Sequence, residues 1–235
     1  MSSSIMTNRR SRRSVGYSAN RARKARVREL ISEGSLEELA VWAAEDPQVL
    51  RPLIGLVFDP DELICWRTIH VLGLIAPRVF ADKPERIRLI IRQQFWHMND
   101  ESGNIGWYAP QVIGEMVANV PTLVNEYAHR LPAFFVEEPF EKGAYWAVAR
   151  ISEQSPVVFR PFIPNLIKGC ADEDPDIRYH SLTALNRVDP TTVEDAARRL
   201  ADDDAEVRLY DRDRKDFSKA TIADLAADIL GNRSR

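Results

Sequence analysis

"ELICWRTIHVLGLIA", residues 62–76, is the first of four segments of this chain that share one layout. The others are "GNIGWYAPQVIGEMV" (103–117), "EPFEKGAYWAVARIS" (138–152) and "PDIRYHSLTALNRVD" (175–189). In each segment an apolar lead residue is followed, three to eight positions later, by small or apolar residues. The leads are Ile64, Ile105, Phe140 and Ile177, with a degenerate fifth at Val207, which gives steps of 41, 35, 37 and 30 residues. Repeats of that length predict stacked helical hairpins.

Each repeated helix is predicted to have a core face and an outward face. Positions 0, 4, 7 and 8 from the lead fall on one helical face and are mostly apolar or small, so we expect them in the core. Positions 2 and 6 point away from that face. Stacking would align them along an inner, concave helix layer, where rigid aromatic rings offer large contact area at small entropic cost. The predicted partner-binding residues are Trp66, His70, Trp107, Gln111, Lys142, Trp146 and Tyr179. The alternative is that packing between repeats buries these side chains.

Proline and acidic residues mark the predicted helix starts. Proline is expected just inside helices at Pro47, Pro84, Pro121 and Pro156, because the first N–H groups of a helix have no intrahelical partner. Acidic residues in "FDPDEL", "MNDESG" and "DEDPDI" are expected to cap the helices that follow. No sustained alternating run of β-branched residues appears, so no strands are predicted. The predicted fold class is all-α, a right-handed α-solenoid of about four to six hairpins, with Gly73 and Gly114 where helices cross closely.

The same segments resemble a known family. The layout "DPDELICWRTIHVLGLIA", then "WHMNDESGNIGWYAPQVIGE", then "GAYWAVARISE", is similar to small bacterial HEAT-repeat proteins related to the repeats of phycobilisome lyases. The resemblance runs from about Val27 to Val188. It implies HEAT-like hairpins in an armadillo-like α-solenoid that serves as a protein-binding scaffold. It implies no catalytic residue, and the role of that family is largely uncharacterised.

The charge distribution predicts a basic arm before the helical domain. Residues 1–28 contain nine of the 32 basic residues and none of the 35 acidic ones, so the remaining 207 residues carry a net charge of −12. With few large apolar residues, residues 1–20 are expected to be disordered. Arg9, Arg10, Arg12 and Arg13 form either a nucleic-acid- or anion-binding arm or a solvated tail. Residues 21–235 are expected to form one domain. Within it, residues 202–235 form a divergent cap whose second helix is predicted to begin near Phe217 or Ser218.

Catalytic and metal-binding motifs are absent from the sequence. There is no HExxH, GxSxG, Walker loop or dinucleotide fingerprint, and the acidic runs at 172–176 and 202–206 lack the glycine of an EF-hand loop. Asp100, Glu101 and Glu115 could each supply a carboxylate near the aromatic row, but without an identified partner. Two distant cysteines, Cys65 and Cys170, suggest neither a disulfide framework nor a zinc site. We therefore predict no catalytic, cofactor-binding or metal-binding residue, no membrane segment, and a cytoplasmic location.

Two functions from different classes follow from these observations. The favoured one is a non-catalytic scaffold or adaptor that binds a protein or peptide on its concave aromatic face. The alternative is a nucleic-acid-binding HEAT-like protein, in the manner of solenoids that excise alkylated bases with tryptophan and aspartate side chains. The net charge of −12 outside the arm weighs against a track for the phosphate backbone. A chromophore-attaching lyase is a third candidate, disfavoured because neither cysteine has a reactive setting.

Overall fold

The computed structural model describes residues 19–99 and 106–231 of the chain. It is mostly helical and divides into two compact units after Val71, within helix α4 (Glu62–Asp82). The predicted arm, with Arg9, Arg10, Arg12 and Arg13, lies outside the described residues. Residues 19 and 20, the part of the range 1–20 that is described, are helical. The lead Ile105 and the carboxylates Asp100 and Glu101 also lie outside the described residues.

The N-terminal unit is built from short helices. A helix over residues 19–33 lies beside α2 (Leu36–Glu45) and α3 (Leu50–Gly55), followed by the 3₁₀ turn η1 (Leu56–Phe58) and the first half of α4. Gly34 ends the first helix in the left-handed conformation, with φ of 74°. Its N–H donates to Ile31 O and the Ser35 N–H donates to Leu30 O, which is the Schellman pattern. This turn directs Leu36 and Leu39 into the core beside Leu30.

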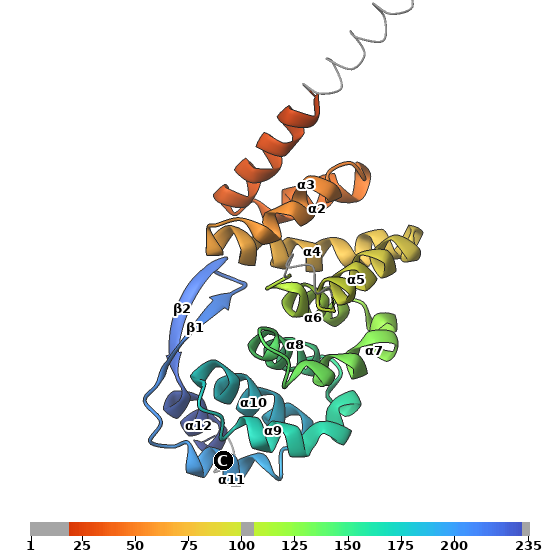
Figure 1. Cartoon of the computed structure of the whole chain (residues 1–235). Helices are drawn as coiled ribbons and strands as arrows, with labels where there is room; N and C mark the ends of the chain where they lie inside the picture. Colours follow the sequence, from red (N-terminus) through yellow and green to blue (C-terminus); the bar gives the residue numbers. More distant parts are fainter. Residues whose placement is uncertain (1–18, 100–105, 232–235) are drawn as a thin grey trace, which may run out of the picture. The chain divides into compact units, whose positions relative to one another are not determined.

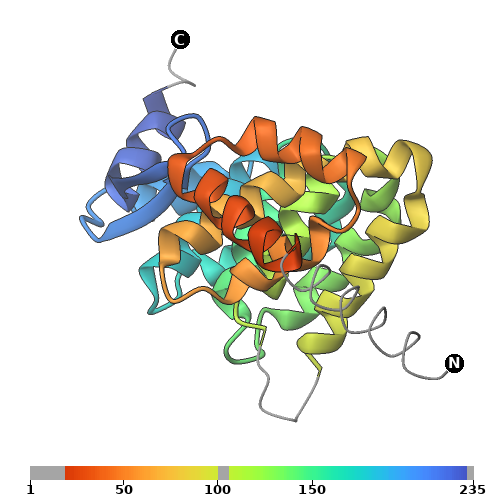
Figure 2. The same ribbon diagram turned by 90° about the horizontal axis from the view of Figure 1, so that it is seen from above.

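The C-terminal unit continues as paired helices and turns (Figures 1 and 2). After the second half of α4 it contains α5 (Pro84–His97), α6 (Ala109–Ala118), α7 (Pro121–Tyr127), η2 (Ala128–Phe134), α8 (Glu141–Ser152), η3 (Pro156–Phe162), α9 (Ile163–Gly169), α10 (Pro175–Val188), α11 (Val193–Arg199) and α12 (Ile222–Gly231). Helix α6 packs on α8, and α8 packs on α10. The repeated segments therefore place their helices next to one another in this unit.

The predicted helix boundaries are largely confirmed. Pro84, Pro121 and Pro156 occupy the first position of α5, α7 and η3. Asp174 caps α10 by accepting a hydrogen bond from the Asp176 N–H at 2.9 Å, and the Asp61 carboxylate accepts one from the Leu63 N–H at the start of α4. Pro47 differs, because it lies in a turn before α3 rather than inside a helix. Asp61 and Asp174 thus act as helix caps, whereas the run at 202–206 leads into strand β1 (Glu206–Asp211) and the acidic residues of "MNDESG" lie outside the described residues.

Glycine permits the close helix crossings that the sequence predicts. A Cβ added to Gly114 of α6 would lie 2.6 Å from the Ala147 Cβ and 2.7 Å from the Ala147 Cα of α8. A Cβ on Gly73 of α4 would lie 2.6 Å from the Cγ of Glu115. Real side chains do not approach that closely, so Gly114 sets the distance between α6 and α8. Gly73 leaves room for the Glu115 side chain.

A β-hairpin in the C-terminal cap contradicts the prediction that the chain has no strands. β1 (Glu206–Asp211) and β2 (Asp216–Thr221) pair antiparallel, with Tyr210 opposite Phe217, and α12 begins only at Ile222. The predicted helix start near Phe217 or Ser218 is therefore wrong. The Asp211 carboxylate accepts hydrogen bonds from the N–H groups of Asp213 and Arg214, which stabilises the tight turn. The guanidinium of Arg208 lies 3.6 Å from the centre of the Phe217 ring, a cation–π contact across the two strands.

Helix α4 is the one helix among the described residues that is long and apolar enough to cross a membrane. It has 21 residues, and 56% of its most apolar window is buried inside the protein. A core helix of a folded domain has the same features. Ile64, Ile69, Leu72 and Ile75 are buried, which places them in the protein core.

Candidate functional site

A small hollow lies on the face of α8 and α10 that points away from the core. Its volume is about 200 Å³. Strand β1 and the hairpin turn close one side of it, and three arginines and three aromatic rings supply most of its wall. We call it the arginine hollow; it is lined by Trp146, Ala149, Arg150, Glu153, Tyr179, His180, Thr183, Arg187, Leu209, Tyr210 and Arg212.

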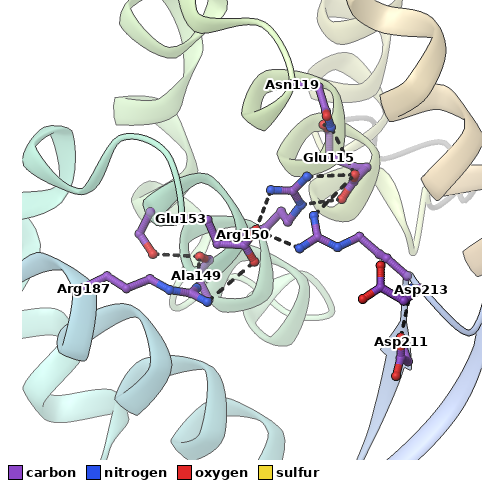
Figure 3. Close-up of polar contacts among 10 residues, drawn as sticks. Glu115, Asn119, Ala149, Arg150, Glu153, Arg187, Asp211 and Asp213 are labelled. Carbon is purple, nitrogen blue, oxygen red and sulfur yellow. Dashed lines mark hydrogen bonds and ion pairs between the residues drawn. The ribbon is translucent and has the colours of Figure 1, made fainter. Parts of the chain in front are cut away.

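Behind the hollow, α6 and α8 are joined by a buried ion pair (Figure 3). Arg150 of α8 donates from Nε to Glu115 Oε2 at 2.7 Å and from Nη2 to Glu115 Oε1 at 3.1 Å. The side chains are only 8% and 4% exposed, respectively. Asn119, one turn along α6, donates to Glu115 Oε1 at 3.1 Å. Both oxygens of Glu115 therefore accept hydrogen bonds within the protein, as a buried carboxylate requires.

A second carboxylate, Glu153, connects this pair to the hairpin. Its Oε2 accepts from Arg150 Nη1 and from Arg212 Nη2, each at 2.8 Å. Arg212 follows β1 and also lies 4.0 Å from Glu115 Oε1 through its Nη1. One guanidinium from the hairpin turn is thus held against two carboxylates from different helices. The hairpin has a specific attachment to α8 as well as its packing on α10.

The cluster contains more positive than negative charge. Three guanidiniums (Arg150, Arg187 and Arg212) share two carboxylates (Glu115 and Glu153), a surplus of one positive charge. Arg187 is the least compensated, because its Nη2 is 3.6 Å from Glu153 Oε1 and its Nη1 donates to the neutral Ala149 carbonyl at 2.7 Å. Burial lowers the pKa of Arg187 below its ordinary value, and the nearby positive charges of Arg150 and Arg212 lower it further. An anion entering the hollow would relieve this repulsion.

Two other groups of the wall, Tyr179 and His180, favour their neutral forms. Burial raises the pKa of Tyr179. Burial also lowers the pKa of His180 to about 4; repulsion from Arg187 adds to this effect, and Asp174 opposes it. At neutral pH, His180 therefore contributes an uncharged ring. The arginines are the cations of the wall.

The structure brings together two of the predicted partner-binding residues, Trp146 and Tyr179. Both are partly buried and line the arginine hollow, as does Thr183, at the second outward position of the fourth repeat. Trp66 and His70 are partly buried and belong to the N-terminal unit. One outward residue of the third repeat, Trp146, and the outward residues of the fourth therefore meet in one hollow.

Three predicted residues lie elsewhere in the C-terminal unit. Trp107 is 60% exposed and, with Lys142, lines a separate hollow rich in carboxylates. It precedes α6, which begins at Ala109, so the helical spacing from Ile105 does not apply to it. Lys142 forms ion pairs with Asp174 at 2.5 Å and with Asp176 at 3.5 Å. Gln111 is 9% exposed, and a Cβ on Gly143 would lie 2.6 Å from its Oε1, so its predicted outward position is wrong.

The charged cluster itself was missed by the sequence analysis, although a signal was present. Glu115, Arg150 and Arg187 each lie ten positions after the lead residue of their repeat. Positions 2, 6 and 10 follow one another at four-residue spacing, so they share a helical face. Extending the outward face by one turn would have found all three. Arg212 could not have been found in this way, because it belongs to the unexpected hairpin.

The described residues offer little for metal or thiol chemistry. No three His, Cys, Asp or Glu side chains within residues 19–99 and 106–231 are grouped so as to hold a metal ion. Cys65 and Cys170 are buried free thiols, and burial raises their pKa to about 11 and about 12. A thiol with a raised pKa is a poor nucleophile at neutral pH.

Comparison with known proteins gives one similar sequence. An uncharacterised protein of Archaeoglobus fulgidus is 27% identical over 190 residues, which cover 77% of this chain and 96% of the archaeal protein. No protein-family model matches the chain, and no solved structure matches it. The similarity extends across almost the whole archaeal protein and brings no assigned activity with it.

The buried pair predicts a strong asymmetry between single and double substitutions. Glu115→Met or Arg150→Met alone leaves an uncompensated buried charge, so each should lower the free energy of unfolding by about 3 kcal/mol or more. The double variant should cost much less than the sum of the two, because it removes both charges. Urea unfolding measures these values. Arg198→Met, at an exposed ion pair, is the control and should change stability by no more than about 0.5 kcal/mol. Additive single effects would contradict the buried pairing.

His180 predicts a specific loss of stability in mild acid. Its pKa is about 4 in the folded protein, against an ordinary value of 6.5. Above pH 6.5 both folded and unfolded chains hold it neutral; as the pH falls toward 4, the unfolded chain binds the proton first and stability falls. The difference in unfolding free energy between wild type and His180→Gln should shrink by up to about 3 kcal/mol from pH 7 to pH 4. A difference that stays constant across this range would show that His180 is not desolvated.

Proposed function

We propose that this chain is a HEAT-like right-handed α-solenoid of about four to six hairpins that acts as a non-catalytic binding scaffold. The repeated layout of the sequence and the packing of α6 on α8 and of α8 on α10 support this architecture. Solenoids of this kind present an extended inner helix layer, on which side chains from successive repeats combine into one surface. The outward positions of α8 and α10 form the arginine hollow in this way.

The bound group is an acidic side chain or carboxylate of a protein or peptide partner. The observation that carries this proposal is the surplus guanidinium of Arg187, which lies beside Trp146, Tyr179 and Tyr210. Arginine binds carboxylates through two parallel hydrogen bonds, and the aromatic rings can cover the aliphatic part of the same side chain. Tyr, Trp and Arg are also the residues that most often dominate binding energy at protein interfaces.

The size of the hollow favours a side chain over a cofactor or whole substrate. About 200 Å³ is less than the roughly 300–1,000 Å³ of ordinary small-molecule sites. Such a space accepts a carboxylate group and a few carbon atoms. The rest of the partner would lie along the neighbouring outward faces of the helices, which is how an extended peptide contacts a solenoid.

The hydrogen bonds that Glu115 already accepts support a binding role over the glycosylase-like alternative. That chemistry needs a carboxylate able to accept a proton from water or to approach the sugar. Both Glu115 oxygens already accept hydrogen bonds from Arg150, and its side chain is 4% exposed. Glu153 is likewise engaged by Arg150 and Arg212. The carboxylates of the hollow therefore position arginines.

Selection from a random peptide library on the full-length protein tests this proposal. We expect enriched peptides to share an Asp or Glu, because the hollow offers a cation and no free anion. For the tightest peptide, Arg187→Gln should weaken binding about tenfold or more, and Trp146→Ala about 30-fold, which corresponds to about 2 kcal/mol. Arg160→Gln, at an exposed arginine outside the hollow, is the matched control and should bind like wild type. Peptides without acidic residues, or affinities insensitive to Arg187 and Trp146, would contradict the proposal.

A further inference from the structure

A basic groove runs along the N-terminal unit, between the helix over residues 19–33 and the segment around α3. Its volume is about 1,000 Å³. Arg23, Lys24 and Arg28 line one side, and Arg51 lies on the other. The remaining described lining residues are Ala19, Asn20, Pro47, Gln48, Pro52, Gly55 and Leu56, so no described carboxylate forms part of its wall. This unit of an otherwise acidic protein therefore presents a concentrated positive surface.

Two of the four cations have no acidic partner. Arg23 pairs with Asp46 at 3.3 Å, and Arg28 pairs with Asp59 at 2.7 Å. Lys24 and Arg51 are exposed and form no ion pair with any residue in the described ranges 19–99 and 106–231. Unpaired, exposed cations on both sides of a groove attract a polyanion that lies between them.

The walls of the groove suit a phosphate backbone rather than stacked bases. None of the described lining residues is aromatic, so the described part of the groove offers no platform on which single-stranded bases could stack. Arg23 and Arg28 are five residues apart, or about 7.5 Å along a helix axis. Successive phosphates of one DNA strand are spaced about 3.4 Å along the duplex axis, so this separation spans about two of them. A Cβ on Gly55 would meet nothing within 4 Å, which leaves the backbone open to close approach.

The sequence before the groove has the same charge. Residues 1–18 contain Arg9, Arg10, Arg12 and Arg13 and no acidic residue. Residues 1–18 therefore add only positive charge to the sequence immediately before the groove-forming helix. The net charge of −12 applies to residues 29–235, so it leaves out Arg23, Lys24 and Arg28 and does not describe the groove.

We propose that the basic groove binds the phosphate backbone of double-stranded nucleic acid without sequence preference. This inference is independent of the arginine hollow, which belongs to the other unit and has a different ligand. Phosphate contacts give affinity and orientation but carry no sequence information. Lys24 and Arg51 supply the free charges, while Arg23 and Arg28 keep their carboxylate partners.

The test is a salt titration with the full-length protein and a fluorescent duplex of arbitrary sequence, followed by anisotropy from 50 to 200 mM salt. Wild type should bind, with affinity falling steeply as salt rises. Lys24→Glu/Arg51→Glu should weaken binding at low salt by roughly tenfold or more and lower the salt slope by about 2, one unit for each lost phosphate contact. Gly55→Glu, which places a negative charge in open space, should also weaken binding and guards against a folding artefact in the double variant.

Lys83→Glu is the matched control, because Lys83 is exposed and lies in the other unit, at the start of α5. It should leave the affinity unchanged. Three results would overturn the proposal: no duplex binding at 50 mM salt, duplex binding that is indifferent to the groove variants, or binding to phosphatidylserine vesicles without binding to the duplex. The second would assign the affinity to the arm alone, and the third would make the groove a membrane-surface site.

Discussion

The buried pair between Arg150 and Glu115 is the interaction on which the C-terminal unit depends most. Both side chains are almost fully removed from water, so each needs the other to offset the cost of desolvation. Gly73 leaves the space that Glu115 occupies, and Gly114 brings α6 close enough to α8 for the two side chains to meet. Arg150 then holds Glu153, and Glu153 holds Arg212 of the hairpin turn. One pair thus connects two helices and a β-hairpin.

The same network determines what remains available for a ligand. Arg150 donates hydrogen bonds to two carboxylates, those of Glu115 and Glu153. Both oxygens of Glu115 accept hydrogen bonds within the protein, so neither side chain is free to act on a substrate. Arg187 has a lowered pKa, and its Nη2 lies 3.6 Å from the carboxylate oxygen Oε1 of Glu153. Its positive charge is therefore the one that an added anion would stabilise most. The proposed binding role assigns the ligand contact to Arg187 and a structural role to Arg150 and Glu115. The basic groove, in the other unit, provides a second positive surface, on which Lys24 and Arg51 form no ion pair with a described residue and Arg23 and Arg28 are paired.

The sequence predicted the helical part of this structure well, because its signals are local. Proline at helix starts and aspartate caps act within one helical turn. Gly114 marks the close crossing of α6 and α8 and lies in one of the repeated segments. Trp146 and Tyr179 lie inside regular helices, and both line the arginine hollow. Trp107 is exposed, as predicted, but it precedes its helix and lines a different hollow. The outward prediction is wrong for Gln111, which is buried against Gly143.

Other features depend on contacts that no local pattern reveals. The hairpin has a charged sequence, and its two strands are stabilised by pairing with each other and by Arg212 reaching Glu153, 59 residues away. The charge of the basic groove was visible in residues 21–28, but its opposite side, Arg51, required the fold. The net charge of the whole chain, −3, does not reveal either positive surface, because each has a local excess of positive charge in a chain whose total charge is negative.

The most direct measurement of the central claim is the NMR spectrum of the arginine Nε–H groups in the folded protein. If Arg150 is buried and bound by both carboxylates, its Nε–H should exchange slowly with water, and its signal should barely move when an acidic peptide is added. The signal of Arg187 should shift on the same addition, because its guanidinium has the weakest internal partner. An Arg150 signal that exchanges as fast as those of exposed arginines, or that follows the peptide while Arg187 does not, would contradict the account.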